Sequence, residues 1–463
     1  MKKIILMLTL LTLSFCTFSQ IVTTWQGPST GGSWSDAANW DNGVPVAATT
    51  DIIFDGSLAS LTGGFISITD VVQTNPNFSY NRLRVINNAT VNLSGNANTY
   101  FYFYYSIDID TGCRVNIGGT GTKLFEIGGQ FSTISTINGI LDLQGQGNSS
   151  NPANFVPTNT TFGSTGRCTV NGKIILSGLN AKFTPNAITP VFEAGSELGI
   201  KRDGGFIPKA NFKNGSLIHV EGATGSVPQF SSGSTFEGEI RWNCPQQTAG
   251  GSSAIVLPSA SFSYYDSLVI ISTGTKSIRL ATSPSNYYVK NLVVNGGTVE
   301  LSSPGGSGIY KQRFDALTQN GGTIIGNAPG VAGFDNAYNP DTLTISGNFI
   351  QNGGIFDFST RTPVNTSPNA SFVLQVGGDV SIGGTVRLSQ PNFAPNCSLI
   401  FNGQVEQRFN IPTGGRLTGT IPMVINNTSS DAGVSLQSNV TLPDALIFRS
   451  GYVFLNNFDL TIP

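Results

Sequence analysis

The stretch Asn295-Gly296-Gly297-Thr298-Val299 places a glycine pair directly before a short β-branched run. Glycine and asparagine adopt the positive φ of tight turns at little cost, and the short strand that follows cannot bury its own apolar face. It has to stack on neighbours of the same kind. The pattern returns at intervals of 25, 32 and 30 residues, in Asn320-Gly321-Gly322-Thr323-Ile324, Asn352-Gly353-Gly354-Ile355-Phe356 and Ile382-Gly383-Gly384-Thr385-Val386. This repetition predicts an all-β chain folded as a right-handed parallel β-helix.

The composition supports strands and turns. The 463 residues include 56 glycines and 30 phenylalanines but three methionines, and no convincing helix follows residue 20. Only 11% of the residues are charged and the formal net charge is −2, so the basic surface of a nucleic-acid-binding protein is missing. The length suits two or three compact domains or one elongated domain, and the repeats favour the second.

Less regular coils precede the glycine pairs. Gly195-Ser196, Gly215-Ser216 and Gly233-Ser234 recur at 20 and 18 residues, and each precedes an alternation of apolar residues. Residues 245–260 carry little charge and many turn-forming residues, which is typical of a boundary. We therefore expect a signal peptide at 1–19, an N-terminal cap at 20–60, β-helix segments at 61–245 and 261–463, and an irregular connection at 246–260.

The first residues have the pattern of an export signal. Lys2 and Lys3 precede an apolar stretch that is too short to span a bilayer, and Ser19 is a small residue suited to cleavage. We expect a mature chain that begins at Gln20 and is extracellular or held at the cell surface. The alternative is lipid attachment at Cys16, and no later apolar run is long enough for a transmembrane helix.

Three of the four tryptophans lie close together near this point, at Trp25, Trp34 and Trp40. A β-helix exposes the open end of its core, and large aromatic side chains held by a loop rich in Gly, Pro and Asp can cover it. We expect these residues to form the N-terminal cap. The functional alternative is a platform on which sugar rings stack.

This segment carries a resemblance. The tryptophans with Gly31-Gly32 and Gly43-Val44-Pro45, followed by Asp51-Ile52-Ile53-Phe54, resemble the first segment of bacterial surface proteins with parallel β-helix regions. Autotransporter-like passengers and secreted proteins of the Bacteroidetes are of this kind, and the later stretches 343–354, 400–407 and 451–462 are similar to the second group. The resemblance implies a surface or secreted β-helix exported by type IX secretion.

Cargo of that pathway carries a C-terminal sorting domain, and none is recognisable here. The chain reaches Pro463 directly after an expected strand at Leu460-Thr461-Ile462. We expect either that the sequence is part of a longer protein or that a partner covers this end, because an uncovered coil presents unpaired strand edges.

The densest aromatic run gives a candidate binding site. Strand alternation places Tyr100, Tyr102 and Tyr104 on one face, with Phe101, Phe103 and Tyr105 on the other, so that the first three could stack on a polysaccharide. Packing within the stack explains the run equally well. Asp108 and Asp110 follow on one face and are candidate ligands of a calcium ion, since their carboxylate oxygens could share a hard cation.

The sequence supplies no catalytic residues that rise above background. Glu237, Glu239 and Arg241 share one face of an expected strand and imitate the paired carboxylates of sugar-cleaving β-helices, although a solvated outer face explains them better. Lys201-Arg202-Asp203 and the pair His219 and Glu221 suit solvated turns or outer faces. We find no phosphate-binding loop, no nucleophile elbow and no Cys/His pairing.

Four cysteines remain after the expected cleavage, and we expect them to be buried free thiols. The closest pair is 55 residues apart, which is about two coils and roughly 9 to 10 Å between α-carbons, too far for a disulfide. None has metal-site spacing, and the only histidine stands alone. They are Cys113, Cys168, Cys244 and Cys397.

The sequence thus favours a non-enzymatic exported β-solenoid that acts as an adhesin, a stalk or a matrix component. Two alternatives stay open. One is a β-helix that binds or degrades polysaccharide, with surface glycans or other surface proteins as partners. The other is a secretion cargo whose partners are the export machinery.

Overall fold

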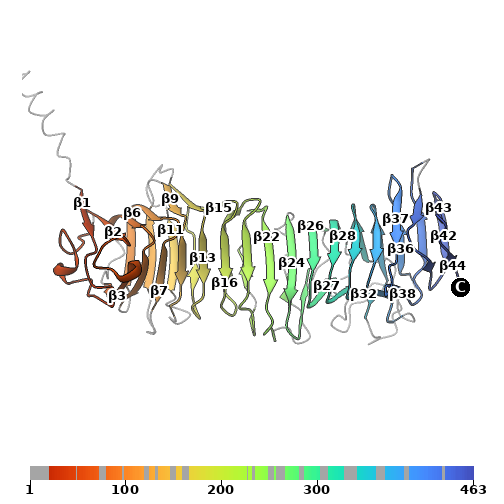
Figure 1. The fold of residues 1–463 in the computed structure, drawn as a ribbon, viewed down its shortest axis with the longest axis horizontal. Coiled ribbons are helices and arrows are strands. Elements are labelled where there is room, and N and C mark those ends of the chain that lie inside the picture. The colour runs from red at the N-terminus through yellow and green to blue at the C-terminus, as the bar shows by residue number, and fades with distance from the viewer. Residues whose placement is uncertain are drawn as a thin grey trace, which may run out of the picture. The chain divides into compact units, whose positions relative to one another are not determined.

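The computed structural model describes residues 20–463 apart from Ala48, Val227 and the segments 72–79, 96–98, 119–124, 131–133, 146–152, 159–165, 232–234, 249–254, 257–265, 281–285, 303–310, 328–340, 361–370, 391–395 and 430–432. The predicted signal peptide lies outside the described residues. The chain forms two compact units, Met1–Pro190 and Val191–Pro463. Each is a stack of parallel strands, so the predicted all-β parallel β-helix is confirmed (Figure 1).

Helices are almost absent from the described part of the chain. It contains two three-residue 3₁₀ turns, η1 (Ala37–Asn39) and η2 (Thr62–Gly64), and no helix in it is long and apolar enough to cross a membrane.

Two sheets build the first unit. Sheet A contains β1 (Ile21–Thr24), β2 (Thr50–Asp55), β4 (Tyr80–Ile86), β6 (Thr99–Ile109), β9 (Ile134–Ile137) and β12 (Arg167–Val170), with β8 (Phe125–Gln130), β11 (Ala153–Thr158) and β14 (Lys182–Phe183) on a branch from β6. Sheet B contains β3 (Phe65–Val71), β5 (Thr90–Gly95), β7 (Arg114–Gly118), β10 (Ile140–Leu143) and β13 (Lys173–Leu176).

The core of this unit is a set of side-chain columns that run across the coils. Parallel pairing in register places one apolar residue of each coil directly over the next, and burial of each such side chain contributes about 1.5–3 kcal/mol. Along sheet A one fully buried column is Phe54, Val85, Ile109, Ile137 and Val170. Along sheet B another is Ile66, Val91, Val115, Leu141 and Ile174.

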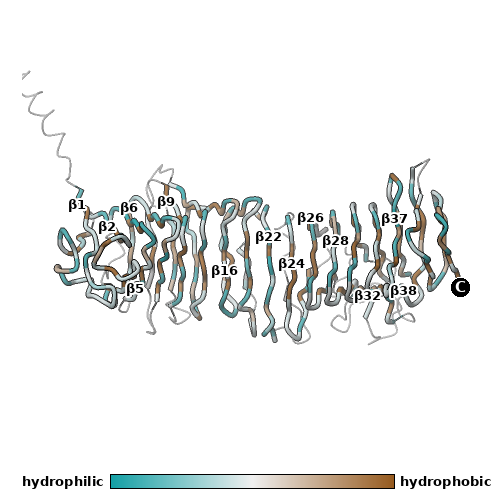
Figure 2. Tube along the Cα trace, viewed as in Figure 1, coloured by the Kyte–Doolittle hydropathy of each residue, from teal (hydrophilic) through white to brown (hydrophobic). Residues whose placement is uncertain are grey.

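The second unit continues the same plan with a third sheet. Sheet C begins with β16 (Glu197–Ile200), β19 (Leu217–Val220), β22 (Glu239–Asn243), β24 (Ser267–Ser272), β26 (Asn286–Val294) and β28 (Lys311–Gln319). After β28 it divides into two rows, β30 (Asp341–Ile345), β33 (Phe372–Val376), β36 (Ser398–Phe401), β39 (Met423–Asn426), β42 (Leu446–Ser450) and β31 (Phe349–Gln351), β34 (Val380–Ile382), β37 (Gln407–Asn410), β40 (Val434–Leu436), β43 (Val453–Phe454). Figure 2 shows hydrophobic and hydrophilic residues alternating along these strands, as expected for a wall with one buried face.

Sheet D and several short pairs complete this unit. Sheet D contains β23 (Ile255–Val256), β25 (Ser277–Arg279), β27 (Thr298–Ser302), β29 (Thr323–Asn327), β32 (Ile355–Ser359), β35 (Thr385–Arg387) and β38 (Arg416–Thr418). The short strands are β15 (Val191–Phe192), β18 (Asn211–Phe212), β21 (Thr235–Phe236), β17 (Phe206–Ile207), β20 (Gln229–Phe230), β41 (Val440–Thr441) and β44 (Leu460–Thr461). β22 pairs directly with β24, so the stack continues across the connection predicted at 246–260, most of which lies outside the described residues.

The glycine pairs form the corners between sheets C and D. They separate β26 from β27, β28 from β29, β31 from β32 and β34 from β35, and the strands that follow them stack in register. The asparagines before the first three pairs form a ladder, in which the Asn320 amide donates to Asn295 at 2.8 Å and the Asn352 amide donates to Asn320 at 2.7 Å.

The three tryptophans form the predicted cap on the first unit. Trp25, Trp34 and Trp40 are at most 4% exposed, and the ring of Trp40 makes edge contacts with the other two at 5.0 and 4.9 Å. Trp34 also packs edge-on against Phe101 of β6 at 5.2 Å, and Trp40 donates its indole N–H to the Trp34 carbonyl at 2.9 Å. Because the rings are buried, they are not a platform for a sugar.

The four cysteines that follow the predicted signal peptide are buried free thiols, as predicted. Burial raises the pKa of Cys168 and Cys397 to about 12 and that of Cys244 to about 11, and it also raises the pKa of Cys113.

The last coil of the second unit has a different surface from the others. Within the described residues β42, β43 and β44 each pair with one neighbour, in β39, β40 and β41. Several large apolar side chains here are exposed: Ile447, Phe448, Tyr452, Phe454, Leu455 and Ile462.

Candidate functional site

The tyrosines of β6 lie on the outer face of sheet A, as the alternation predicted. Phe101 and Phe103 are fully buried, whereas Tyr100 and Tyr102 are half-buried and Tyr104 is exposed. The rings of Tyr100 and Tyr102 lie 6.2 Å apart at 41°. Aromatic side chains so placed offer apolar faces with hydroxyl groups at their tips, which suits contact with sugar rings.

Tyr105 does not join the buried face, and this part of the prediction is wrong. In the ladder between β4 and β6, Tyr80 lies opposite Phe103 and Arg82 lies opposite Ser106, so β6 carries one extra residue at this point. Such a bulge turns two consecutive side chains to one face. Tyr105 is consequently half-buried beside Tyr104, with ring centroids 5.0 Å apart.

Two arginines adjoin these tyrosines on β4. Arg82 and Arg84 are both exposed, and the guanidinium of Arg82 lies 5.6 Å from the ring centroid of Tyr105. Arg84 lies opposite Asp108 in the ladder. This pair was not among the predicted site residues, although the pattern Arg82-x-Arg84 between buried alternate residues could have located it.

Asp108 and Asp110 have different surroundings. Asp108 accepts hydrogen bonds from the Ser106 hydroxyl at 2.7 Å and from the Thr136 N–H at 3.2 Å. Burial raises the pKa of Asp108 against the opposing effects of these bonds and of Arg84 and Arg82. Asp110 is exposed and follows the end of β6. Among the described residues no three His, Cys, Asp or Glu side chains are grouped to hold a metal ion, so the calcium site remains a prediction without further support.

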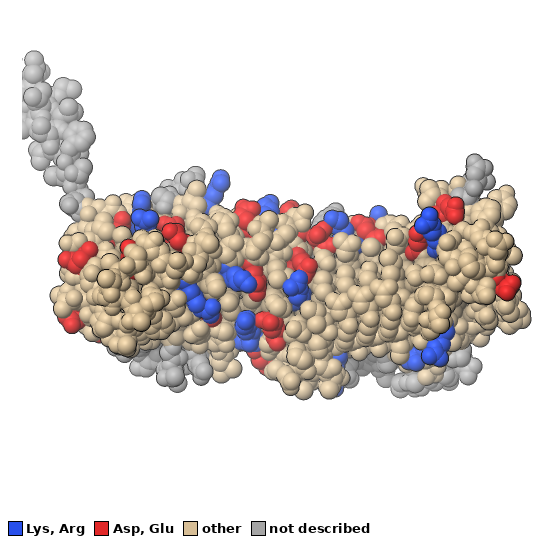
Figure 3. Space-filling view, viewed as in Figure 1, with Lys and Arg blue, Asp and Glu red and all other residues tan. Residues whose placement is uncertain are grey.

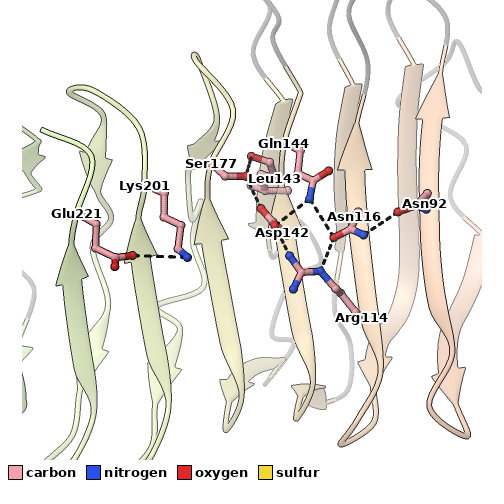
Figure 4. Close-up of polar contacts among 9 residues, drawn as sticks. All are labelled: Asn92, Arg114, Asn116, Asp142, Leu143, Gln144, Ser177, Lys201 and Glu221. Atoms are coloured by element: carbon pink, nitrogen blue, oxygen red, sulfur yellow. Dashed lines mark hydrogen bonds and ion pairs between the residues drawn. The ribbon is translucent and has the colours of Figure 1, made fainter. Parts of the chain in front are cut away.

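A second polar feature of the first unit crosses the outer face of sheet B (Figure 4). Arg114 of β7 pairs with Asp142 of β10 at 2.5 Å and donates through Nε to Asn116 at 2.7 Å. Asp142 also accepts from the Ser177 hydroxyl at 2.5 Å, and the Asn116 amide donates to Asn92 at 2.7 Å. The network links side chains of successive coils, so its role is to stabilise the stack.

In the second unit, charged side chains of sheet C meet around His219. Nδ1 of His219 lies 3.7 Å from a Glu197 carboxylate oxygen and Nε2 lies 3.7 Å from one of Glu221. Lys201 Nζ lies 3.6 Å from the other Glu221 oxygen, the contact that Figure 4 also draws. These distances exceed those of hydrogen bonds, and Nε2 has no hydrogen-bond partner among the described residues.

Lys201, His219 and Glu221 were not predicted to form a site, and the structure brings them together with Glu197. The reason is the register, since β16 and β19 pair Glu197 with Leu217 and Gly199 with His219. The 20-residue spacing of the two Gly-Ser turns was the signal that could have found Glu197.

The prediction that Glu237, Glu239 and Arg241 share one strand face is wrong for Glu237. β22 begins at Glu239, and Glu237 lies before it, 3.9 Å from Lys213 Nζ. Arg241 donates through Nε to Glu239 at 2.8 Å, and both side chains lie on the outer face. Arg241 lies next to His219 in the ladder, so the charged cluster draws on three successive strands.

Comparison of this chain with protein-family models, with curated proteins and with solved structures finds no match.

Proposed function

We propose that this chain is an exported, non-enzymatic β-helix that binds at the bacterial surface or in the surrounding matrix as an adhesin, a stalk or a matrix component. The observation that carries the proposal is the way polar side chains are used. Outside the His219 cluster, several described polar side chains on the outer surface bond to the next coil, as in the Arg114 network and the Asn320 ladder. Such lateral bonds favour a stiff support over a site that acts on a substrate.

The character of the surface adds support. Figure 3 shows a face on which uncharged side chains cover most of the area, with acidic and basic groups scattered among them and several of opposite sign side by side. A surface of this kind suits repeated weak contacts with a polymer or with cells, and such contacts add up when several engage at once.

The test is a binding assay with the mature chain, residues 20–463, on a glycan array and on whole bacterial cells, with and without calcium. We expect saturable binding to a subset of glycans or cells and no change in the glycan itself. Absence of binding to every surface would overturn the adhesive role. Loss of binding on removal of calcium would support the predicted site at Asp108 and Asp110.

The export part of the proposal has its own test. Residues 1–19 fused to a reporter enzyme are expected to carry it out of the cytoplasm, and N-terminal sequencing of the exported full chain is expected to begin at Gln20. Retention of the fusion in the cytoplasm contradicts the proposal.

A second candidate function is polysaccharide cleavage at the His219 cluster. The observation in its favour is the imidazole held between Glu197 and Glu221, because catalytic contacts are often long when no substrate is bound. This candidate predicts slow release of reducing ends from a polysaccharide, abolished in the variant His219→Ala and retained in Arg416→Ala.

A further inference from the structure

Around Arg82 and Arg84 on the outer face of sheet A, the positive charge is more accessible than the negative charge of the carboxylates opposite them in the ladder. Arg82 and Arg84 are exposed, while the nearest carboxylates lie lower in the surface: Asp51 is 9% exposed and Asp108 is half-buried. A ligand that approaches this face meets the guanidinium groups before the carboxylates.

These two arginines differ from the arginines that support the fold. Within the described part of the chain, neither Arg82 nor Arg84 has a carboxylate oxygen within 4.0 Å of its guanidinium. Four other arginines do form such ion pairs, namely Arg114 with Asp142, Arg241 with Glu239, Arg279 with Glu300 and Arg387 with Asp357. The hydrogen-bond donors of Arg82 and Arg84 are therefore available to a ligand.

A third arginine, Arg167, forms a row with Arg82 across the strands of sheet A. Ile134 of β9 pairs with Arg167 of β12, and it lies two residues before Thr136, which pairs with Asp108. Arg167 therefore stands level with Ser106 and Arg82, and it lies three strand spacings, or about 14 Å, from Arg82. It is exposed and has no carboxylate oxygen within 4.0 Å among the described residues.

Aromatic rings border this row. Arg82 lies over Tyr105, and Tyr104, Tyr102 and Tyr100 continue along β6 on the same outer face. Guanidinium groups bind planar anionic groups through two parallel N–H bonds, and the rings supply flat apolar contacts beside them.

We propose that this arginine and tyrosine face, formed by Arg82, Arg84, Arg167 and the tyrosines of β6, binds an acidic polysaccharide. Carboxylate or sulfate groups lie on the guanidiniums, and sugar rings lie against the tyrosines. The inference rests on the proposed binding function and names its ligand. A nucleic acid is a poorer fit, because the positive charge is local and the net charge of the chain is −2.

The test uses the mature chain with dextran sulfate, polygalacturonate and uncharged dextran as probes, measured by calorimetry at two salt concentrations. We expect binding to both acidic polymers, weaker binding at higher salt and little binding to dextran. The double variant Arg82→Gln, Arg84→Gln is expected to bind about tenfold or more weakly. Tyr102→Ala is expected to weaken binding of polygalacturonate several-fold.

Two controls make the result specific. Arg416→Gln removes an exposed arginine of sheet D and is expected to leave affinity unchanged, and circular dichroism of every variant checks the fold. Equal affinity of the double variant and the parent chain overturns the inference while leaving the adhesive role intact. Failure of the parent chain to bind any glycan or cell overturns the proposed function as well.

Discussion

At each Asn-Gly-Gly corner the two glycines are required for different reasons. The first glycine has ordinary φ, but a Cβ on Gly321 would lie 2.7 Å from the Asn295 carbonyl oxygen of the preceding coil. The second, Gly322, has φ of +67°, and a Cβ there would lie 2.4 Å from the Gly297 carbonyl oxygen. Close approach of the coils and turn conformation therefore both select glycine.

Substitution of Gly322 by alanine is expected to lower the free energy of unfolding by about 1–3 kcal/mol. Alanine is strained in the left-handed conformation of this residue, and its Cβ would also clash with the backbone of the preceding coil. Two control variants separate the causes: Gly414→Ala, with φ of +96° and open space, and Gly118→Ala, with open space and no positive φ. Urea unfolding measures all three. The expected order of destabilisation is Gly322, then Gly414, then Gly118, and an equal effect at Gly322 and Gly118 would count against this explanation.

The buried thiols predict a chemical and a pH response. Burial raises the pKa of Cys168 and Cys397 to about 12, whereas the thiols of the unfolded chain ionise near pH 9. As the pH rises, the unfolded state therefore loses these protons before the folded state does. The contribution of the buried thiols to the free energy of unfolding is fully present below about pH 9 and is lost as the pH rises toward 12.

Thiol labelling checks this account. The mature chain is expected to stay unlabelled by a thiol reagent at pH 8 in buffer and to label at four positions in denaturant. Rapid labelling of the folded chain would show that at least one thiol is accessible.

Among the elements, the N-terminal cap has the largest expected effect on stability. Trp34 is 2% exposed and contacts Trp40, Tyr80 and Phe101. Trp34→Ala leaves a large cavity at the end of the stack and is expected to destabilise the first unit by about 3–5 kcal/mol. Hydrogen exchange of sheets A and B measures the loss, and Leu179→Ala, an exposed position in the same unit, serves as the control.

β6 shows how far the sequence alone could go. Alternation correctly placed Phe101 and Phe103 inside and Tyr100, Tyr102 and Tyr104 outside. It could not find the extra residue near Tyr105, because a bulge depends on the pairing with β4 and leaves no local mark in a run of aromatic residues. In the same way, composition marked the tryptophan cap but gave no sign of the arginines on β4 and β12.

On the scale of the whole molecule, repeated turns predicted the stack because each turn has a local chemical cause. Which side chains lie next to each other on successive coils depends instead on the number of residues in each coil. The unequal intervals of 25, 32 and 30 residues do not determine that number. This is why the His219 cluster and the Arg82 row, each assembled from successive coils, were not predicted as groups.

The claim that the molecule binds without catalysis is tested most directly by measuring two quantities in one experiment. The mature chain is incubated with acidic and neutral polysaccharides, while bound protein and newly formed reducing ends are followed over time. We predict retention of the chain on acidic polymers with no reducing ends above the protein-free control, and the same result for His219→Ala. A steady release of reducing ends that His219→Ala abolishes would contradict the account.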